Sequence, residues 1–306
     1  MMKHLDGFFA YLQFQKRYSD KTIAAYRSDI AQFESFLSDN ALSAGEDLLA
    51  VTHKQVRLWI IDLSSRAVQP RSIGRKISAL RTYYKYLLKK GVLSKNPMTK
   101  VVVPKSGRRL PLFIDKAGMD KMYKAFDTHV EPSEATTTFT DIRDALIIDL
   151  LYAAGLRRSE LIDLKLESID WATAQLRVVG KGSKERILPL GKPTLTLLTT
   201  YLQERNTRFG SAPGRPLILT GKGEAAYPNL IYRVVQQAMA GNTTLSRKSP
   251  HVLRHTFATH LSNNGAELNA VKELLGHSSL ASTQVYTHSS INKLKEIYKK
   301  AHPKGG

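Results

Sequence analysis

Five kinds of side chain in the second half of the sequence have the chemistry needed to break and rejoin a phosphodiester. They are two arginines, two histidines, a lysine, a tyrosine and a nearby glutamate: Arg157, Glu160, Lys181, His251, Arg254, His277 and Tyr286. Substitution at phosphorus requires neutralisation of the non-bridging oxygens, a nucleophile, and a proton for the leaving sugar oxygen. These residue types can supply all three without a metal ion.

Arg157 and Arg254 are the candidates for holding the phosphate. A planar guanidinium donates two parallel hydrogen bonds and keeps its charge near neutral pH. Ser249 is a favourable N-cap and Pro250 a favourable first helical residue. The spacing therefore places His251 and Arg254 on one face of the first helical turns, where the helix dipole favours an anion.

Tyr286 is the candidate nucleophile, with His251 as the base that removes its proton. A phenol is mostly protonated at neutral pH, so it needs a base and nearby positive charge to attack. A tyrosine in an apolar helix is more often a core residue, but Tyr286 follows the pair Gly276 and His277. Gly276 is a typical end for a helix over 266–275, after which His277 can donate a ring N–H to a phosphate oxygen.

Lys181 is the candidate acid for the leaving oxygen, and Lys184 is its competitor. Both lie in the turn of an expected β-hairpin, although hairpin turns are often basic for solubility alone. A lysine whose pKa is lowered by neighbouring cations can deliver a proton. Glu160, three residues after Arg157, can orient that arginine or a histidine.

Metal and cofactor chemistry find little support in the sequence. It contains no cluster of carboxylates suited to catalytic magnesium, no Walker-type glycine-rich loop and no cysteine. The spacing of His251, His255 and His260 raises the alternative of zinc, but no glutamate lies between the first two histidines. We therefore expect no metal and no cofactor, with His255 and His260 packed or hydrogen-bonded.

The composition predicts a polyanionic partner. The 306 residues include 46 Lys and Arg against 26 Asp and Glu, and the excess is spread over both halves. Double-stranded DNA fits this charge best. The sequence has no apolar run long enough to span a membrane and no export signal, so we expect a cytoplasmic, nucleoid-associated protein with no membrane partner.

Hydrophobic periodicity predicts a mainly α-helical fold with a small β-sheet. Apolar spacing indicates an N-terminal four-helix unit that ends at Gly91, with two helices in 4–38, the second capped by Asp20, and further helices at 53–66 and 71–90. Its last helix carries basic candidates for DNA binding beside buried tyrosines, and Lys184 joins them from the hairpin: Arg71, Arg75, Lys76, Arg81 and Lys184. A solvated charged face is the alternative.

Proline and glycine punctuation at 104–111 predicts a linker between a DNA-binding domain (1–103) and a catalytic domain (112–306). In the second domain the pattern predicts helices at 114–126 and 142–154, separated by an exposed polar loop. Strands at 175–179 and 185–190 form the hairpin, with a third strand at 168–171, and the chain from 193 to 302 returns to helical patterning.

The chain resembles tyrosine recombinases of the phage-integrase class, most closely the Xer group. The resemblance covers nearly the whole length and rests on ordered motifs: Gly155–Leu161, Gly180–Leu190, His251–His260, Leu274–His277 and Gln284–His288, with Tyr18, Ser19, Thr22, Tyr26, Asp29, Phe33, Ser78–Arg81, Asn96 and Pro97 in the N-terminal part. It implies that Arg157, Lys181, His251, Arg254, His277 and Tyr286 are catalytic and Glu160 accessory. It also implies a 3′-phosphotyrosyl intermediate with a free 5′-hydroxyl, so that strands are rejoined without ATP.

The resemblance further implies a two-domain clamp on DNA with an inverted-repeat site, and a homotetramer or a heterotetramer with a related recombinase. A septal DNA translocase is a further partner if the role is chromosome dimer resolution. The C-terminal helix over 291–301 would dock on a neighbouring protomer, or else pack within its own chain. An integrase or transposase of a mobile element, a type IB topoisomerase and a non-catalytic sequence-specific DNA-binding protein are the alternatives.

Overall fold

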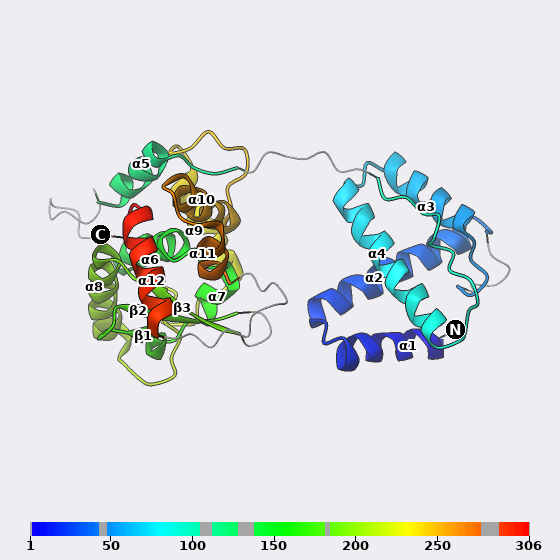
Figure 1. Ribbon diagram of the computed structural model, residues 1–306, viewed down its shortest axis with the longest axis horizontal. Helices are drawn as coiled ribbons and strands as arrows, with labels where there is room; N and C mark the ends of the chain where they lie inside the picture. The colour runs from blue at the N-terminus through cyan, green and yellow to red at the C-terminus, as the bar shows by residue number, and fades with distance from the viewer. Residues whose placement is uncertain are drawn as a thin grey trace. The chain divides into compact units, whose positions relative to one another are not determined.

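The chain forms two compact units, 1–109 and 110–306, in a computed structural model. The structure describes residues 2–42, 48–104, 112–127, 138–180, 184–276 and 288–305. Figure 1 shows the helices and strands of each unit. The expected linker 104–111 lies, apart from Pro104, outside the described residues.

The N-terminal unit is a bundle of helices around one apolar core. Its elements are α1 (Met2–Ala10), the π-helical turn η1 (Tyr11–Gln15), α2 (Asp20–Asp39), α3 (His53–Ser65) and α4 (Pro70–Lys89). The core includes Phe8, Phe33, Trp59 and Tyr83, each at most 1 % exposed. Each of these four aromatic residues lies on the apolar face of an amphipathic helix, which explains why the periodicity of the sequence located these helices.

The start of α2 differs from the expectation. Ser19 rather than Asp20 is the N-cap, because its hydroxyl accepts a hydrogen bond from the backbone N–H of Thr22. Asp20 is the first helical residue, where its negative charge favours the N-terminal end of the helix dipole. The last helix of the unit, α4, ends as expected just before Gly91, whose φ of +70° is typical of a glycine that follows a helix.

The second unit is mainly helical and contains a three-stranded antiparallel sheet, so the expected fold class is confirmed. Its elements are α5 (Lys116–Asp127), α6 (Phe139–Ala153), α7 (Arg158–Asp163), the 3₁₀ turn η2 (Leu166–Ser168), β1 (Ile169–Asp170), β2 (Gln175–Val179), β3 (Glu185–Pro189), α8 (Lys192–Phe209), α9 (Pro228–Met239), α10 (Pro250–Asn263), α11 (Leu268–Leu274) and α12 (His288–Ala301).

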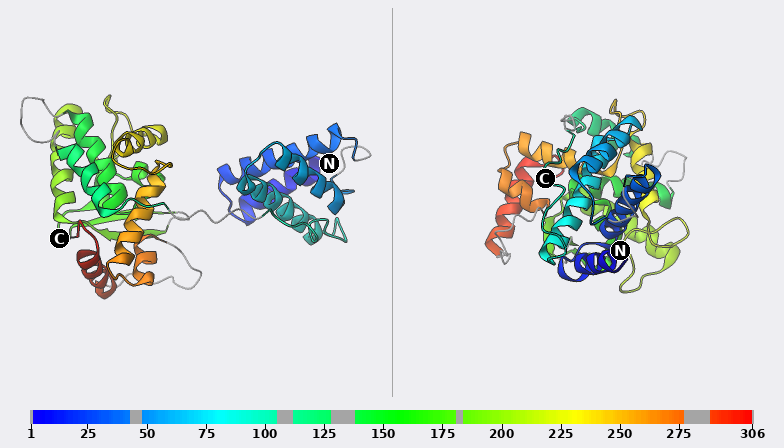
Figure 2. Two further views of the ribbon diagram at one scale, coloured as in Figure 1. Left: turned by 90° about the horizontal axis from the view of Figure 1, so that it is seen from above. Right: turned by 90° about the vertical axis from the view of Figure 1, so that its right-hand side faces the viewer.

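Helix α6 is the centre of this unit. All but three of its residues are buried, and α8, α9 and α10 pack around it, as Figures 1 and 2 show. A helix that is buried on nearly every side is enclosed by other elements. Helix α10, which carries His251 and Arg254, is therefore positioned by the core of the unit.

The hairpin places β3 beside α7, since Arg186 of β3 pairs with Glu160 of α7. Strand β2 pairs with both neighbours, and Val178 lies opposite Arg186. The backbone N–H of Gly180 donates to the carbonyl of Lys184 at 2.7 Å and closes the turn. The hairpin and the third strand are thus confirmed, with the third strand reduced to residues 169 and 170.

Helix α12 packs within its own chain. Leu294, Tyr298 and Ala301 are buried in the core of the second unit, and the side chain of Asn264 donates to the carbonyl of Ala301 at 2.7 Å. In the single chain, the intramolecular alternative for this helix is therefore the one observed.

Within the described residues, no helix has the length and apolar character needed to cross a bilayer.

Candidate active site

Arg157 and Glu160 are brought together by the turn that starts α7. The Arg157 backbone N–H donates to Glu160 Oε2 at 2.8 Å, and Arg157 Nη1 donates to Oε1 at 2.5 Å. The preceding Gly155 has a φ of +55°, and a Cβ there would lie 2.5 Å from the ring of Phe257. Only glycine permits this close approach of the turn to α10.

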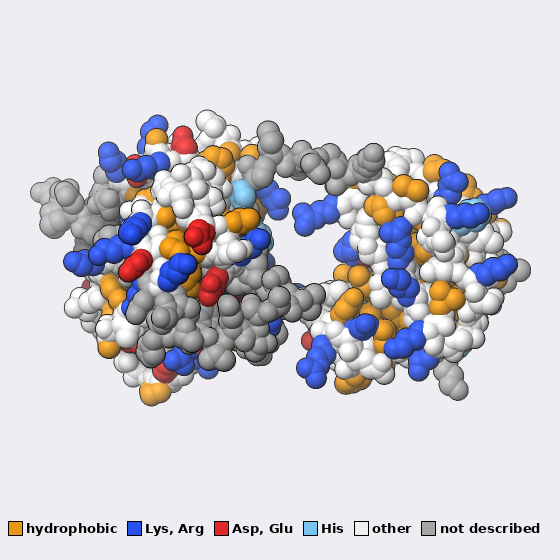
Figure 3. Space-filling model, viewed as in Figure 1, with side chains coloured by type: hydrophobic (Ala, Val, Ile, Leu, Met, Phe, Trp, Pro, Cys, Tyr) orange, Lys and Arg blue, Asp and Glu red, His pale blue; other side chains and the backbone are white. Residues whose placement is uncertain are grey.

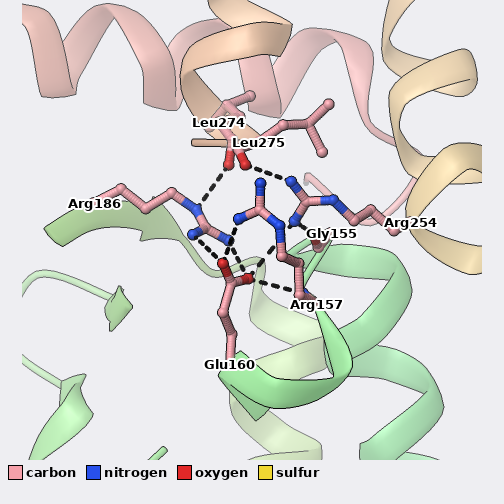
Figure 4. Close-up of polar contacts among 7 residues, drawn as sticks. All are labelled: Gly155, Arg157, Glu160, Arg186, Arg254, Leu274 and Leu275. Carbon is pink, nitrogen blue, oxygen red and sulfur yellow. Dashed lines mark hydrogen bonds and ion pairs between the residues drawn. The ribbon is translucent and has the colours of Figure 1, made fainter. Parts of the chain in front are cut away.

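Arg254 comes from the second turn of α10 and lies beside this pair. It is 8 % exposed, and its guanidinium donates to the carbonyls of Gly155 and Leu275. Arg254 Nη1 is also 3.6 Å from Glu160 Oε2. Figure 4 shows the guanidinium groups of Arg157 and Arg254 converging near the Glu160 carboxylate. The two expected phosphate-holding arginines are thus neighbours in space although 97 positions separate them in the sequence.

A third arginine, Arg186 of β3, belongs to the same cluster. It donates Nη1 to Glu160 Oε1 at 2.9 Å, Nη2 to Oε2 at 2.7 Å and Nε to the Leu274 carbonyl at 3.1 Å. Arg186 lies in one of the motifs that carry the family resemblance, but no role was predicted for it from the sequence. The available signal was its phase, because Arg186 lies two residues before buried Leu188 and therefore on the same face of the strand.

The charge of this cluster is strongly biased. Burial alone would raise the pKa of Glu160, but hydrogen bonds and charge from Arg186 and Arg157 outweigh it and lower the pKa to about 2. Burial and the charge of Arg157 lower the pKa of Arg254 to about 10, which still leaves it protonated at neutral pH. Three arginines therefore share one ionised carboxylate, and the surplus positive charge suits a phosphate.

His251 precedes Arg254 by three residues on α10, as expected. Ser249 is the N-cap residue and Pro250 the first helical residue, although the Ser249 hydroxyl makes no capping hydrogen bond. Partial burial, followed by the charges of Arg247, Arg254, Arg158 and Arg157, lowers the pKa of His251. Its side chain nevertheless keeps an exposed surface. A neutral, accessible imidazole can accept a proton.

Lys181, His277 and Tyr286 lie outside the described residues, so their positions are not part of this geometry. The described residues just before two of them do reach the cluster. A Cβ on Gly180 would lie 3.6 Å from Glu160 Oε1, and one on Gly276 would lie 3.0 Å from Arg186 Cδ. His260, the third histidine of α10, makes a 2.8 Å hydrogen bond between its Nδ1 and the Tyr152 hydroxyl, as the packing interpretation predicted.

The DNA-binding candidates of α4 differ in their surroundings. Lys76 is buried and donates to Asp29 Oδ1 at 3.0 Å, and Arg75 donates to Asp29 Oδ2 at 2.5 Å while remaining partly exposed. Arg81 donates to the Val101 carbonyl at 2.6 Å.

Arg71 and Lys184 are exposed. On the face seen in Figure 3, Lys and Arg side chains dominate the charged surface of the N-terminal unit.

Comparison with known proteins identifies the family. Residues 113–293 match the model of the phage integrase family, and residues 5–91 match that of the phage integrase N-terminal SAM-like domain. The chain therefore belongs to the phage integrase family of tyrosine recombinases.

Its relatives include proteins named tyrosine recombinase XerC. One from Chlorobaculum parvum is 36 % identical over 98 % of this chain and 94 % of its own length. One from Pelobacter propionicus is 37 % identical over 99 % of this chain and 96 % of its own length.

Solved structures share the fold. XerH site-specific recombinase bound to palindromic difH substrate matches 90 % of this chain and 78 % of its own with a TM-score of 0.69 and 22 % identity. A lambda integrase tetramer bound to a Holliday junction matches 92 % of this chain and 75 % of its own with a TM-score of 0.66 and 19 % identity.

Proposed function

We propose that this protein is a site-specific DNA recombinase that cleaves and rejoins DNA through a 3′-phosphotyrosyl intermediate. The observation that carries the proposal is the convergence of Arg157, Arg254 and Glu160, with His251, whose pKa is lowered by burial and neighbouring arginines, on the same helix as Arg254. Preorganised donors around a developing oxyanion are a large source of catalysis in phosphoryl transfer.

The reaction follows from these roles. The Tyr286 oxygen attacks phosphorus, and His251 takes the phenolic proton. The bond from phosphorus to the 5′ oxygen breaks, and Lys181 protonates that oxygen. Arg157, Arg254 and His277 hold the non-bridging oxygens, which gain charge as phosphorus becomes five-coordinate. One phosphodiester replaces another, so a 5′-hydroxyl from a partner strand reverses the step without ATP.

We propose that both units bind duplex DNA carrying an inverted-repeat site. The excess of basic residues in both halves supports this, as does the exposure of Arg71 and Lys184. Because Lys76 is buried in an ion pair with Asp29, our proposal assigns it a structural role rather than a phosphate contact. The working assembly is a tetramer on two sites, either of identical chains or with a related recombinase.

The relatives named XerC support chromosome dimer resolution in the cytoplasm as the biological role. A nucleoid location and a septal DNA translocase as partner belong to the same proposal. Integration of a mobile element would use the same chemistry, so the position of the natural target site separates the two roles.

Covalent trapping on genomic DNA tests the activity and the role together. Purified protein is incubated with sheared genomic DNA and denatured, and the 3′ ends bound to protein are sequenced. We expect adducts at an inverted repeat with the wild type and none with Tyr286→Phe. Adducts that persist in Tyr286→Phe would exclude this nucleophile, and none with the wild type would exclude the activity. A single chromosomal site supports dimer resolution, whereas sites at element ends favour integration.

A further inference from the structure

Arg186 makes contacts that its place in a strand does not require. Arg186 is 3 % exposed, and its side chain spans from the Glu160 carboxylate to the carbonyl of Leu274. Both nitrogens of the guanidinium fork meet both oxygens of the carboxylate, which fixes the plane of that carboxylate. Arg186 thus joins β3 to the start of α7 and to the end of α11 (Figure 4).

We propose that Arg186 is a positioning residue for strand cleavage, which ties the arginine that grips the phosphate to the helix end from which the segment with His277 and Tyr286 departs. This inference rests on the proposed recombinase function and deepens it. Arg186 acts through Glu160 and through the carbonyl of Leu274 at the end of α11.

The first connection runs through Glu160. Arg186 Nη1 and Arg157 Nη1 share the same oxygen, Oε1, at 2.9 Å and 2.5 Å. With both carboxylate oxygens held by the Arg186 fork, Glu160 presents one orientation to Arg157. A guanidinium that grips a phosphate must be held to within about 0.5 Å of its productive position, and this contact supplies that restraint.

The second connection runs through α11. The last carbonyls of a helix have no intrahelical partner, and here two consecutive ones receive arginines. Arg186 donates to Leu274, and Arg254 donates to Leu275. Gly276 follows with a φ of +63°, and a Cβ there would come 3.0 Å from Arg186 Cδ and 3.2 Å from its Nη1. The end of α11 and Gly276 therefore pack against the Arg186 side chain.

A purely stabilising role would need neither connection. Replacing a buried ion pair by apolar side chains is often neutral for stability, so stability alone does not explain an arginine at this position. Leu188, two residues along the same strand, shows that this side of β3 accepts an apolar side chain.

The test compares Arg186→Lys and Arg186→Gln with Arg205→Lys. Arg205 is an equally buried arginine of α8 whose partners are Asn206 and the carbonyl of Pro216, outside the site. Thermal unfolding is measured first for each variant. DNA affinity and single-turnover cleavage of a suicide duplex are then measured at a temperature well below the unfolding transition of each variant. We expect both Arg186 variants to cleave roughly 10- to 100-fold more slowly, with DNA affinity within about threefold because other phosphate contacts supply it. Arg205→Lys should cleave at the wild-type rate.

A cycle with Glu160→Gln adds a readout that a general loss of stability would not produce. If Arg186 acts through Glu160, the double variant with Arg186→Gln should cleave no more slowly than the slower single variant. Arg186→Gln should raise the pKa of Glu160, because fewer positive charges then offset the effect of burial. The acid limb of the cleavage-rate profile should therefore move to higher pH. That shift should vanish when Glu160 is glutamine.

Wild-type cleavage rates in both folded Arg186 variants would overturn the inference. Equal losses in Arg205→Lys, or multiplicative losses in the double variant, would also overturn it. Absence of a covalent adduct with the wild type would instead overturn the recombinase function, and the inference with it.

Discussion

Arg254 donates a hydrogen bond to the carbonyl of Leu275, two residues before His277. The side chain expected to grip the phosphate therefore also holds the end of the helix that leads to the expected phosphate-binding histidine. A displacement of Arg254 on DNA binding would move this helix end as well, because the Arg254 guanidinium is hydrogen-bonded to the Leu275 carbonyl.

Substitution of Arg254 should separate chemistry from binding. Arg254→Lys keeps the charge but cannot serve the phosphate and both carbonyls, so we expect cleavage to fall by about 10²- to 10³-fold while DNA affinity changes little. Arg254→Ala should also lower stability by about 1–3 kcal/mol for each buried carbonyl left unpaired. Suicide-duplex cleavage, filter binding and denaturant unfolding measure the three effects. Parallel losses of affinity and cleavage in the lysine variant would contradict this separation.

The pH dependence of cleavage should report His251. Its folded pKa is lowered, chiefly by burial and then by Arg247, so the neutral base persists below pH 6.5 and is lost as the pH falls through the lowered value. Arg247→Gln removes one repelling charge and should move the acid limb of the rate profile to higher pH. Arg208→Gln, an exposed arginine of α8, removes the same charge elsewhere and serves as control. If the acid limb of Arg247→Gln stays at the wild-type pH, that limb does not report the titration of His251.

Gly276→Ala should impair cleavage beyond its effect on stability. Its left-handed backbone disfavours alanine by about 1–2 kcal/mol, and the new methyl would press on Arg186. Gly241 has a φ of +79°, and a Cβ added there would have no neighbour within 4 Å, so Gly241→Ala carries the strain without the contact. We expect similar losses of stability in the two variants and slower cleavage in Gly276→Ala alone. Equal cleavage rates would show that the contact with Arg186 is dispensable.

Acid should destabilise the second unit through His302. Burial, then the charges of His260 and Lys304, lowers the pKa of His302 to about 3. The unfolded chain binds a proton near pH 6.5 whereas the folded chain does not, so the free energy of unfolding falls as the pH drops below that value, by up to about 1.4 kcal/mol per pH unit. His302→Phe should reduce this slope in urea titrations between pH 7.5 and 5. An unchanged slope would assign the acid sensitivity to other groups.

Chelation should leave cleavage intact. Arg157 and Arg254 place fixed positive charge around Glu160, and this charge can do the work that a divalent ion does in other phosphoryl-transfer enzymes. Suicide-duplex cleavage in excess EDTA should therefore match that in magnesium. A large loss in EDTA that magnesium restores would require a metal in the reaction.

Local patterns in the sequence predicted most of the fold, because helices and strands follow from the spacing of apolar residues. The helix predicted at 71–90 is observed at 70–89, and the strands predicted at 175–179 and 185–190 are observed at 175–179 and 185–189. Buried charged residues were harder to interpret. Lys76 was grouped with phosphate contacts, yet it neutralises Asp29 of another helix, and that pairing depends on how α2 and α4 pack.

The candidate site divides in the same way. The types and order of Arg157, His251 and Arg254 were readable because each matched a motif with a chemical purpose. The role of Arg186 was not, because its meaning comes from the carbonyl of a residue 88 positions away. Its phase with buried Leu188 was the local clue.

Three guanidinium groups around one carboxylate leave roughly two uncompensated positive charges in the described part of the site. Free oxyanions such as sulfate, orthophosphate and vanadate should occupy this spot in a DNA-free preparation. Phosphate buffer would then act as a competitive inhibitor, and a crystal grown from sulfate should carry that ion at the position of the scissile group.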